Sequence, residues 1–162
     1  MDIKKILVGI DESKYADYAA EYGFSLARKL GAAIAIVNII EPIPAAVSPM
    51  NDTTFGLPLE GTADVNNVEI LNTQNQAADN LLSCIVQKYG SDLQVTQYTD
   101  YGSSAEGIVN CGAQFGADLL VIGTHHRSGF DRLLMGSVAE DVVRKSLVPV
   151  LVVPLTDKPA AE

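Results

Sequence analysis

Short apolar runs rich in β-branched residues alternate along the chain with longer stretches in which apolar residues recur at a period near 3.6. The first kind of run is typical of buried strands and the second of amphipathic helices. The apolar runs predict strands at about Ile3–Ile10, Ala33–Ile40, Asp92–Thr99, Ala117–Gly123 and Pro149–Val153. The periodic stretches predict helices at about Lys14–Leu30, Asp64–Tyr89, Ser103–Phe115 and Val138–Lys145.

This alternation predicts an α/β fold, a single open five-stranded parallel sheet with helices on both faces. The second run is apolar on both faces apart from Asn38, as in a central parallel strand, whereas the third is more polar and belongs nearer an edge. The fifth is expected to form an apolar edge. One domain over residues 1–155 follows, with a long Pro- and Gly-containing loop at 41–63 and a frayed tail at 156–162.

Local signals mark the ends of the predicted helices. Gly31 follows the first helix and is the type of residue that ends a helix in a left-handed conformation. Ser103-x-x-Glu106 and Ser137-x-x-Glu140 both have the capping-box spacing, in which the two side chains bind free N–H groups of the first turn. These spacings predict that a serine starts each of the last two helices.

Composition narrows the class of protein. A hydrophobic content of 48% with 19% charged residues excludes a disordered chain, and no apolar run reaches the roughly 20 residues of a membrane span. A formal net charge of −9 argues against a nucleic-acid partner. Cys84 and Cys111 lack metal or redox spacing and are expected to be buried free thiols. A strand that begins almost at the N-terminus argues against a signal peptide, so a cytoplasmic protein is predicted.

The segment from Gly123 to Val138 carries the strongest functional signal. It joins a buried strand to a helix through a loop that contains Gly136, Ser137 and two of the four arginines, Arg127 and Arg132. Open α/β proteins hold phosphate groups at such a place, because the first N–H groups of the helix are unpaired and its dipole favours an anion. The loop therefore predicts a nucleotide site.

Several segments together resemble the universal stress protein family. They are Ile6-Leu-Val-Gly-Ile-Asp11-Glu-Ser13, Ala117-Asp-Leu-Leu-Val-Ile-Gly-Thr-His125 and Pro149-Val-Leu-Val-Val-Pro154. The nucleotide-binding branch of that family has the pattern G-x2-G-x9-G-[ST], and here the frame reads Gly123-x2-His126-x9-Gly136-Ser137. The resemblance covers nearly the whole chain. It implies a Rossmann-like, adenine nucleotide alpha hydrolase-like fold that binds ATP, with Mg²⁺ or Mn²⁺ alongside, and no metal held by the protein alone.

The resemblance also implies which residues bind the nucleotide. They are expected to border adenine and ribose (Gly9, Ile10, Asp11), to offer main-chain groups to adenine (Val37, Asn38, Ile39), to face ribose and base (Ile122, Gly123), and to reach the phosphates (His126, Arg127, Gly136, Ser137, Val138). Members of the family commonly dimerise through the last strand. A homodimer through Val148–Val153 is therefore expected.

One position departs from the family pattern, because His126 stands where the second glycine is expected. Its side chain could block the approach of main-chain N–H groups to a phosphate. Alternatively, the imidazole could donate a hydrogen bond to the phosphate, above all when protonated. The first alternative lowers affinity for nucleotide, and the second makes binding depend on pH.

Other polar residues have ordinary structural explanations. Asp11 can be a solvated turn residue, although Ser13 is the nearer cap for the first helix. Glu41 is expected to be a solvated charge, and the stripe of Tyr15, Tyr18 and Tyr22 to lie in the core or an interface. His125 and His126 are adjacent in the sequence, and neighbouring residues in an extended loop point apart, so a chelating pair is not expected without other ligands.

The sequence offers no nucleophile–base pair, no nucleophile elbow and no P-loop. Any hydrolysis of ATP should therefore be slow, and no catalytic residue is predicted. The leading hypothesis is a nucleotide-responsive stress or regulatory binding module. In it, bound nucleotide orders the loops at 41–63 and 124–136 and changes a surface that a partner reads. The alternatives are a homodimer of this kind that binds no nucleotide because of His126, and an ATP-using transferase.

Overall fold

A computed structural model describes residues 2–42, 63–124 and 136–155 of the chain. The described strands are β1 (Lys5–Gly9), β2 (Ala33–Ile40), β3 (Val95–Tyr101), β4 (Leu119–Thr124) and β5 (Val150–Pro154). The described helices are α1 (Lys14–Leu30), α2 (Ala63–Tyr89), α3 (Ser104–Phe115) and α4 (Ser137–Lys145). The alternation is the predicted one. The largest differences in bounds concern β3, which begins and ends later along the chain than expected.

The five strands form one parallel sheet in the order β3-β2-β1-β4-β5. This confirms the predicted fold class and places β3 and β5 at the two edges, as expected. The chain moves outward from β1 to β3 and then returns to the other side of β1 to form β4 and β5. Strand order therefore reverses between β1 and β4, where the carboxyl ends of parallel strands leave a crevice for a ligand.

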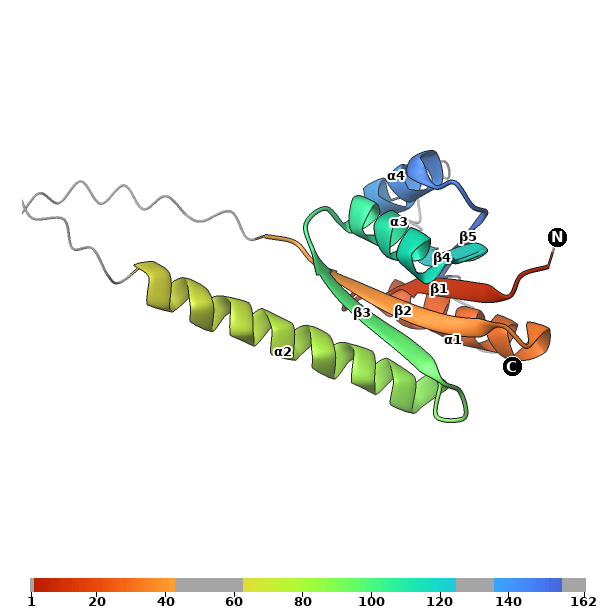
Figure 1. The fold of residues 1–162 in the computed structure, drawn as a ribbon, viewed down its shortest axis with the longest axis horizontal. Helices are drawn as coiled ribbons and strands as arrows, with labels where there is room; N and C mark the ends of the chain where they lie inside the picture. Colours follow the sequence, from red (N-terminus) through yellow and green to blue (C-terminus); the bar gives the residue numbers. More distant parts are fainter. Residues whose placement is uncertain (1, 43–62, 125–135, 156–162) are drawn as a thin grey trace, which may run out of the picture.

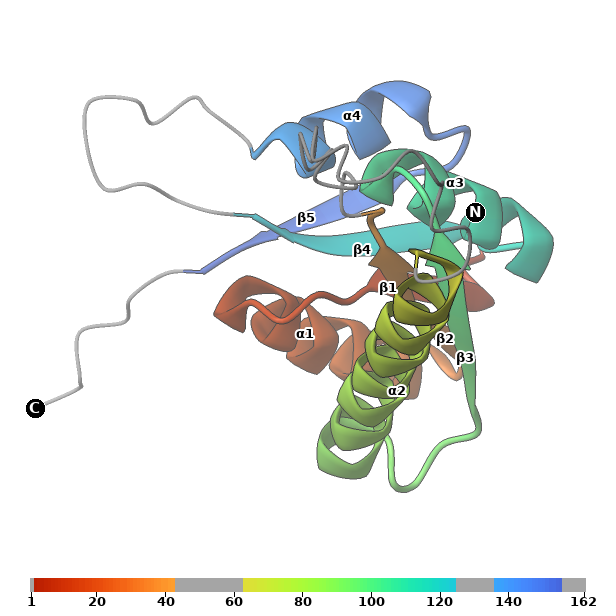
Figure 2. The same ribbon diagram turned by 90° about the vertical axis from the view of Figure 1, so that its left-hand side faces the viewer.

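Two helices cover each face of the sheet (Figures 1 and 2). Successive strand residues point to opposite faces. Ile6 and Val8 of β1 pack with Phe24 of α1 and Leu82 of α2, whereas Leu7 packs on the opposite side with Ile108 of α3. All of these side chains except Ile108 have almost no exposed surface. The buried core thus fixes the sheet between two helical layers. No described helix is long and apolar enough to cross a membrane.

The ends of α1 follow the local signals in the sequence. Ser13 is the N-cap, and its hydroxyl oxygen accepts a hydrogen bond from the N–H of Ala16 at 3.3 Å. Gly31 ends the helix with φ of 63°, a conformation that other residues adopt at a cost. Both predictions are confirmed.

Neither predicted capping box forms. Ser103 does precede α3, but its side chain makes no capping hydrogen bond with a described residue, and Glu106 instead pairs with Lys145 at 2.7 Å. Ser137 is the first residue inside α4 rather than its cap, because Gly136 holds the N-cap position. Glu140 pairs with Arg144 one turn further on, at 2.6 Å. Ion pairs thus hold both glutamates away from the helix starts.

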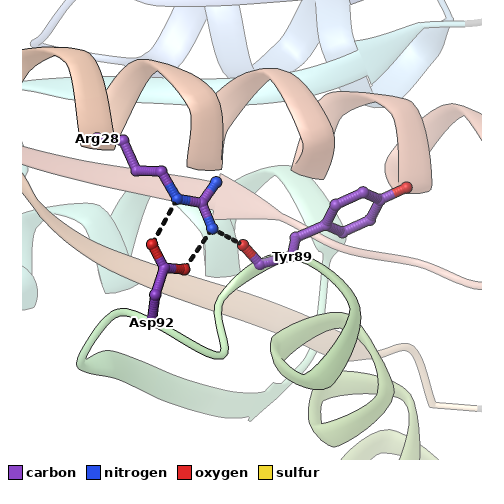
Figure 3. Close-up of polar contacts among 3 residues, drawn as sticks. All are labelled: Arg28, Tyr89 and Asp92. Carbon is purple, nitrogen blue, oxygen red and sulfur yellow. Dashed lines mark hydrogen bonds and ion pairs between the residues drawn. The ribbon is translucent and has the colours of Figure 1, made fainter.

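Polar contacts join α1 to the last turn of α2 (Figure 3). Arg28 donates from Nε and Nη2 to the two carboxylate oxygens of Asp92, at 2.8 and 2.5 Å, and also donates to the main-chain carbonyl of Tyr89. Asp17 accepts from Lys88 at 2.8 Å and from the Tyr89 hydroxyl at 3.0 Å. Arg28 thus binds a carbonyl at the end of α2, where helices leave such groups unpaired.

The two cysteines differ in exposure. Cys111 is buried on α3, and burial together with the nearby Asp100 carboxylate raises the pKa of its thiol. Cys84 is exposed, so the expectation that it is buried is wrong. The buried face of α2 runs through Ala78, Leu82 and Ile85, and Cys84 lies two residues beyond Leu82 on another face of the helix.

Candidate functional site

A cleft lies at the carboxyl ends of β1, β2 and β4, at the point where strand order reverses. It is open at its mouth, and the empty space within it, open solvent at the mouth included, is about 540 Å³. Of the residues predicted for the site, the structure places eight in its lining: Gly9, Ile10, Asp11, Val37, Ile39, Ile122, Gly123 and Val138. The lining also contains six residues that the sequence did not indicate: Ser13, Tyr15, Ala16, Ser104, Ile108 and Ala139.

Gly123 lets the start of α1 approach β4. A Cβ at this position would lie 2.4 Å from the main-chain oxygen of Tyr15 and 2.6 Å from its carbonyl carbon. Main-chain atoms cannot rotate away as the end of a side chain can, so this position requires glycine. Its first role is therefore in packing, and this contact places Tyr15 in the wall of the cleft.

Asp11 organises the turn between β1 and α1. Its Oδ1 accepts a hydrogen bond from the N–H of Ser13 at 2.8 Å, the arrangement of an Asx-turn. The side chain is exposed at the cleft. Asp11 is thus a turn residue, which is one of the two roles that the sequence suggested. The same turn places its carboxylate at the cleft, at the carboxyl end of β1.

Asn38 contributes from beneath the cleft rather than from its lining. Its side-chain amide donates to the main-chain carbonyl of Ile10 at 2.8 Å. The N–H of Ile10 in turn donates to the carbonyl of Val37, also at 2.8 Å. These two bonds fix the chain where it leaves β1. Asn38 therefore shapes the site by holding Ile10, and it does not line the cleft itself.

The main-chain groups of Ile39 face the cleft. The carbonyl of Val37 accepts from Ile10 on the β1 side, and that of Ile40 accepts from Gly102 on the β3 side. Peptide groups of alternate residues face opposite neighbours in a sheet, so those of Ile39 face the β1 side. The β1–β2 ladder ends at Gly9, the partner of Val37. One N–H donor and one C=O acceptor therefore point past the end of β1.

At the start of α4, beside the cleft, three main-chain N–H groups have no partner among the described residues. Gly136 donates to the hydroxyl of the buried Thr124 at 3.4 Å, which ties the helix start to the end of β4. No described side chain caps the helix. Its first internal bond runs from the N–H of Glu140 to Gly136, so the N–H groups of the three preceding residues have no partner within the helix.

Gly136 differs from Gly123 in its surroundings. No atom of the described residues lies within 4 Å of an added Cβ at Gly136, and its φ of −55° suits any residue. Packing within the described residues therefore gives no reason for a glycine here, while the space that these residues leave open at the helix start suits an anion. Ser137 is exposed outside the cleft lining, whereas Val138 belongs to it.

Glu41 is bonded rather than merely solvated. Its Oε1 accepts from the hydroxyl of Ser104 at 2.6 Å and from the N–H of Ser104 at 3.3 Å. The side chain is exposed, as expected of a solvated charge, and it makes these two hydrogen bonds in addition. The acid that caps α3 comes from the end of β2, so no spacing within the α3 segment could reveal it.

Several predictions fall on residues outside the described ranges. They concern His125, His126, Arg127 and Arg132, the larger part of the 41–63 loop, and the tail. The two alternatives for His126 stay predictions. Within the described ranges, no three His, Cys, Asp or Glu side chains are placed to hold a metal ion together.

The sequence of this chain is similar to those of known proteins. A sequence model of the universal stress protein family matches residues 2–154. Universal stress protein MJ0531 of Methanocaldococcus jannaschii is 31% identical over 150 residues, which cover 93% of this chain and 81% of that protein.

Solved structures of that family share the fold. UspA from Lactobacillus plantarum superposes with a TM-score of 0.71 at 20% identity, covering 94% of this chain and 99% of that one. The universal stress protein of Archaeoglobus fulgidus, solved in complex with dAMP, gives a TM-score of 0.51 at 21% identity and covers 94% and 98% of the two chains. With the family model matching nearly its whole length, the chain belongs to the universal stress protein family.

Proposed function

We propose that this protein binds ATP in the cleft between β1 and β4 and acts as a nucleotide-responsive binding module in the cytoplasm. The observation that carries the proposal is the start of α4. There, N–H groups without a partner among the described residues lie at the rim of a cleft at the switch point of the sheet, beside the space that these residues leave open at Gly136. A helix start of this kind attracts phosphate through its N–H groups and its dipole.

The base belongs at the β2 side of the cleft. The outward N–H and C=O of Ile39 match the adjacent acceptor and amino donor that adenine presents along one edge. Ile39, Ile108 and Ile122 supply apolar walls against which a flat base can pack. Asp11, exposed at the end of β1, is within this lining and suits a ribose hydroxyl.

The phosphates belong at the β4 side. Val138 and Ala139 line the cleft at the first turn of α4. Their main-chain N–H groups, together with that of Ser137 before them, would bind phosphate oxygens. His126 and Arg127 are proposed to approach the same oxygens from the preceding loop. The described residues offer no cluster of metal-binding side chains, so Mg²⁺ or Mn²⁺ would be held through the phosphates and water.

Related proteins support adenine nucleotides as the ligand class. The Archaeoglobus fulgidus protein with this fold was solved with dAMP. Its ligand carries the same base and a single phosphate, so it supports base recognition more directly than recognition of a triphosphate. ATP is proposed here because the α4 start and the loop arginines can hold more than one phosphate group.

A homodimer through β5 completes the proposal. β5 is an edge strand, Leu151 and Val152 within it are only partly buried, and Leu147 just before it is 99% exposed. An apolar edge of this kind invites pairing with a second copy. Pro149 and Pro154 flank the strand and would limit the addition of further strands.

The direct test is thermal unfolding with increasing ATP and Mg²⁺, with GTP and adenosine as comparison ligands. At about 100 times its dissociation constant, a ligand that binds only the folded state adds about 2.7 kcal/mol to the free energy of unfolding. We expect a clear rise in melting temperature with ATP. No rise at millimolar ATP would favour the non-binding homodimer, and rapid transfer to an acceptor would favour an enzyme.

The same titration decides the role of His126. A His126→Gly variant that binds ATP more tightly at every pH would identify the imidazole as an obstruction. If the wild type instead binds more tightly as the pH falls below about 6.5 and the variant does not, the imidazole is a phosphate donor.

A further inference from the structure

Ser104 lies where the base is proposed to bind, and its hydroxyl is already engaged. Ser104 begins α3 and lines the cleft together with Ile39 and Ile108. The first turns of α3 are pressed onto the end of β2, since a Cβ at Gly107 would lie 2.5 Å from Cδ1 of Ile39. This close approach places Ser104 beside the residue whose main chain is offered to the base.

Glu41 fixes the direction of the Ser104 hydroxyl bond. A carboxylate oxygen can only accept hydrogen bonds, so the 2.6 Å contact must use the one proton of the hydroxyl. The N–H of Ser104 donates to the same oxygen at 3.3 Å and holds the carboxylate in place. The hydroxyl oxygen can then offer the cleft only its lone pairs, as an acceptor.

A fixed acceptor distinguishes between bases. The amino group of adenine donates hydrogen bonds, whereas the oxo group at the same place in hypoxanthine or guanine only accepts them. An oxo group facing the Ser104 oxygen would set two acceptors against each other, with the Glu41 carboxylate behind them. A buried polar group left without a partner costs binding free energy.

We propose that Ser104, oriented by Glu41, selects a nucleotide whose base carries an exocyclic amino group at this position. Ser104 is the specificity-determining residue and Glu41 the positioning residue. The inference rests on the proposed function, because it assumes that a nucleotide base enters this side of the cleft. The Glu41 charge also disfavours a phosphate there, which leaves the α4 start for the phosphates.

The test compares ATP with ITP, which carries an oxo group in place of the adenine amino group. Titration calorimetry on the full chain should give at least about tenfold tighter binding of ATP than of ITP. Ser104→Ala should weaken ATP binding and reduce the preference for ATP to the part that the main chain of Ile39 supplies. Glu41→Ala should also reduce the preference for ATP, but by improving ITP binding, because the freed hydroxyl can now donate to the oxo group.

Glu41→Gln is the matched control. The N–H of Ser104 can only donate, so the carbonyl oxygen of the glutamine will face it and still accept the hydroxyl proton. This variant loses the charge but keeps the orientation, and it should keep the preference for ATP. Loss of the preference in Glu41→Gln would show that charge repulsion, and not hydroxyl orientation, selects the base, and would overturn the inference.

Two further outcomes are distinguishable. Equal binding of ATP and ITP to the wild type, or a Glu41→Ala variant that melts at a lower temperature but keeps the preference, would overturn this inference and leave nucleotide binding intact. Binding of neither nucleotide to a folded wild-type protein would overturn the proposed function and this inference with it.

Discussion

Gly123 and the main chain of Tyr15 approach so closely that a Cβ on Gly123 would lie 2.4 Å from the Tyr15 carbonyl oxygen. This contact seats the first turn of α1 on the end of β4 and shapes one wall of the cleft. Gly123→Ala should therefore force the backbone apart and lower the free energy of unfolding by about 1–3 kcal/mol. Chemical denaturation of the variant measures this directly.

Gly136→Ala is the matched control for this prediction. An added Cβ meets no atom of the described residues there, and the backbone conformation suits alanine. We expect folding stability within about 0.5 kcal/mol of the wild type, combined with weaker ATP binding because the methyl group occupies the space proposed for a phosphate. A destabilised Gly136→Ala, or a Gly123→Ala as stable as wild type, would contradict this assignment of the two glycines.

The ion pair between Arg28 and Asp92 should make stability depend on pH in the acid range. The hydrogen bond from Arg28, supported by its charge, lowers the pKa of Asp92 to about 2 from an ordinary value of 3.8. A carboxylate with a lowered pKa in the folded state stabilises the protein above its unfolded pKa, and this stabilisation is lost as the pH falls toward the folded value. The contribution should therefore be complete above about pH 5 and decline from pH 4 toward pH 2.

The measurement compares the denaturation midpoints of the wild type and Asp92→Asn between pH 7 and pH 3. Both side chains are substantially exposed, so the difference should be small and should shrink with added salt. A difference that stays constant across this pH range would show that Asp92 acts through packing or neutral hydrogen bonds.

The proposed homodimer predicts an effect of proline within β5. The N–H of Leu120 donates to the carbonyl of Pro149, so by alternation the peptide groups of Val152 face away from β4, toward the open edge. Val152→Pro removes an outward N–H without removing a bond between β4 and β5. Sedimentation or light scattering should then show a shift from dimer toward monomer.

Val152→Ala is its control, because it shortens the side chain and keeps the N–H. The alanine variant should remain dimeric. If both variants are dimeric at the same concentrations as the wild type, pairing through the outer edge of β5 is wrong.

A helix end could be predicted from the sequence where the contact that fixes it is local in the chain. The bounds of α1 were predictable because Ser13 and Gly31 act within a few residues of themselves. The cap of α3 was not, since Glu41 lies 63 residues away in the chain and meets Ser104 only through the packing of α3 on β2. Likewise, Glu106 was drawn to Lys145 on another helix instead of to its own helix start.

The same difference between local and long-range contacts applies to the residues of the candidate site. Gly9 and Val37 were expected in the site because the resemblance to the universal stress protein family implied them, and both line the cleft, since parallel strands end at one edge of the sheet. Tyr15 and Ile108 were missed because helix starts reach the cleft through tertiary contacts, and helical periodicity marks such residues only as buried. Gly123 at the end of β4 was the one signal for the contact with Tyr15. A glycine within a binding motif is, however, ordinarily explained by contact with the ligand.

The proposed function depends most on phosphate binding by the main chain at the start of α4, and two substitutions at Ser137 test this binding. Ser137→Ala removes only the hydroxyl. Ser137→Pro also removes an N–H at the first helical position, where proline is well tolerated and where the extended backbone of Gly136 (ψ of 149°) is compatible with a following proline.

The measurement is titration calorimetry of ATP and adenosine into the wild type and both variants. We predict that Ser137→Pro weakens ATP binding at least about tenfold, that Ser137→Ala weakens it less, and that neither changes adenosine binding. Equal ATP affinity in all three proteins, with helix α4 intact, would contradict the proposal that the start of α4 holds the phosphates.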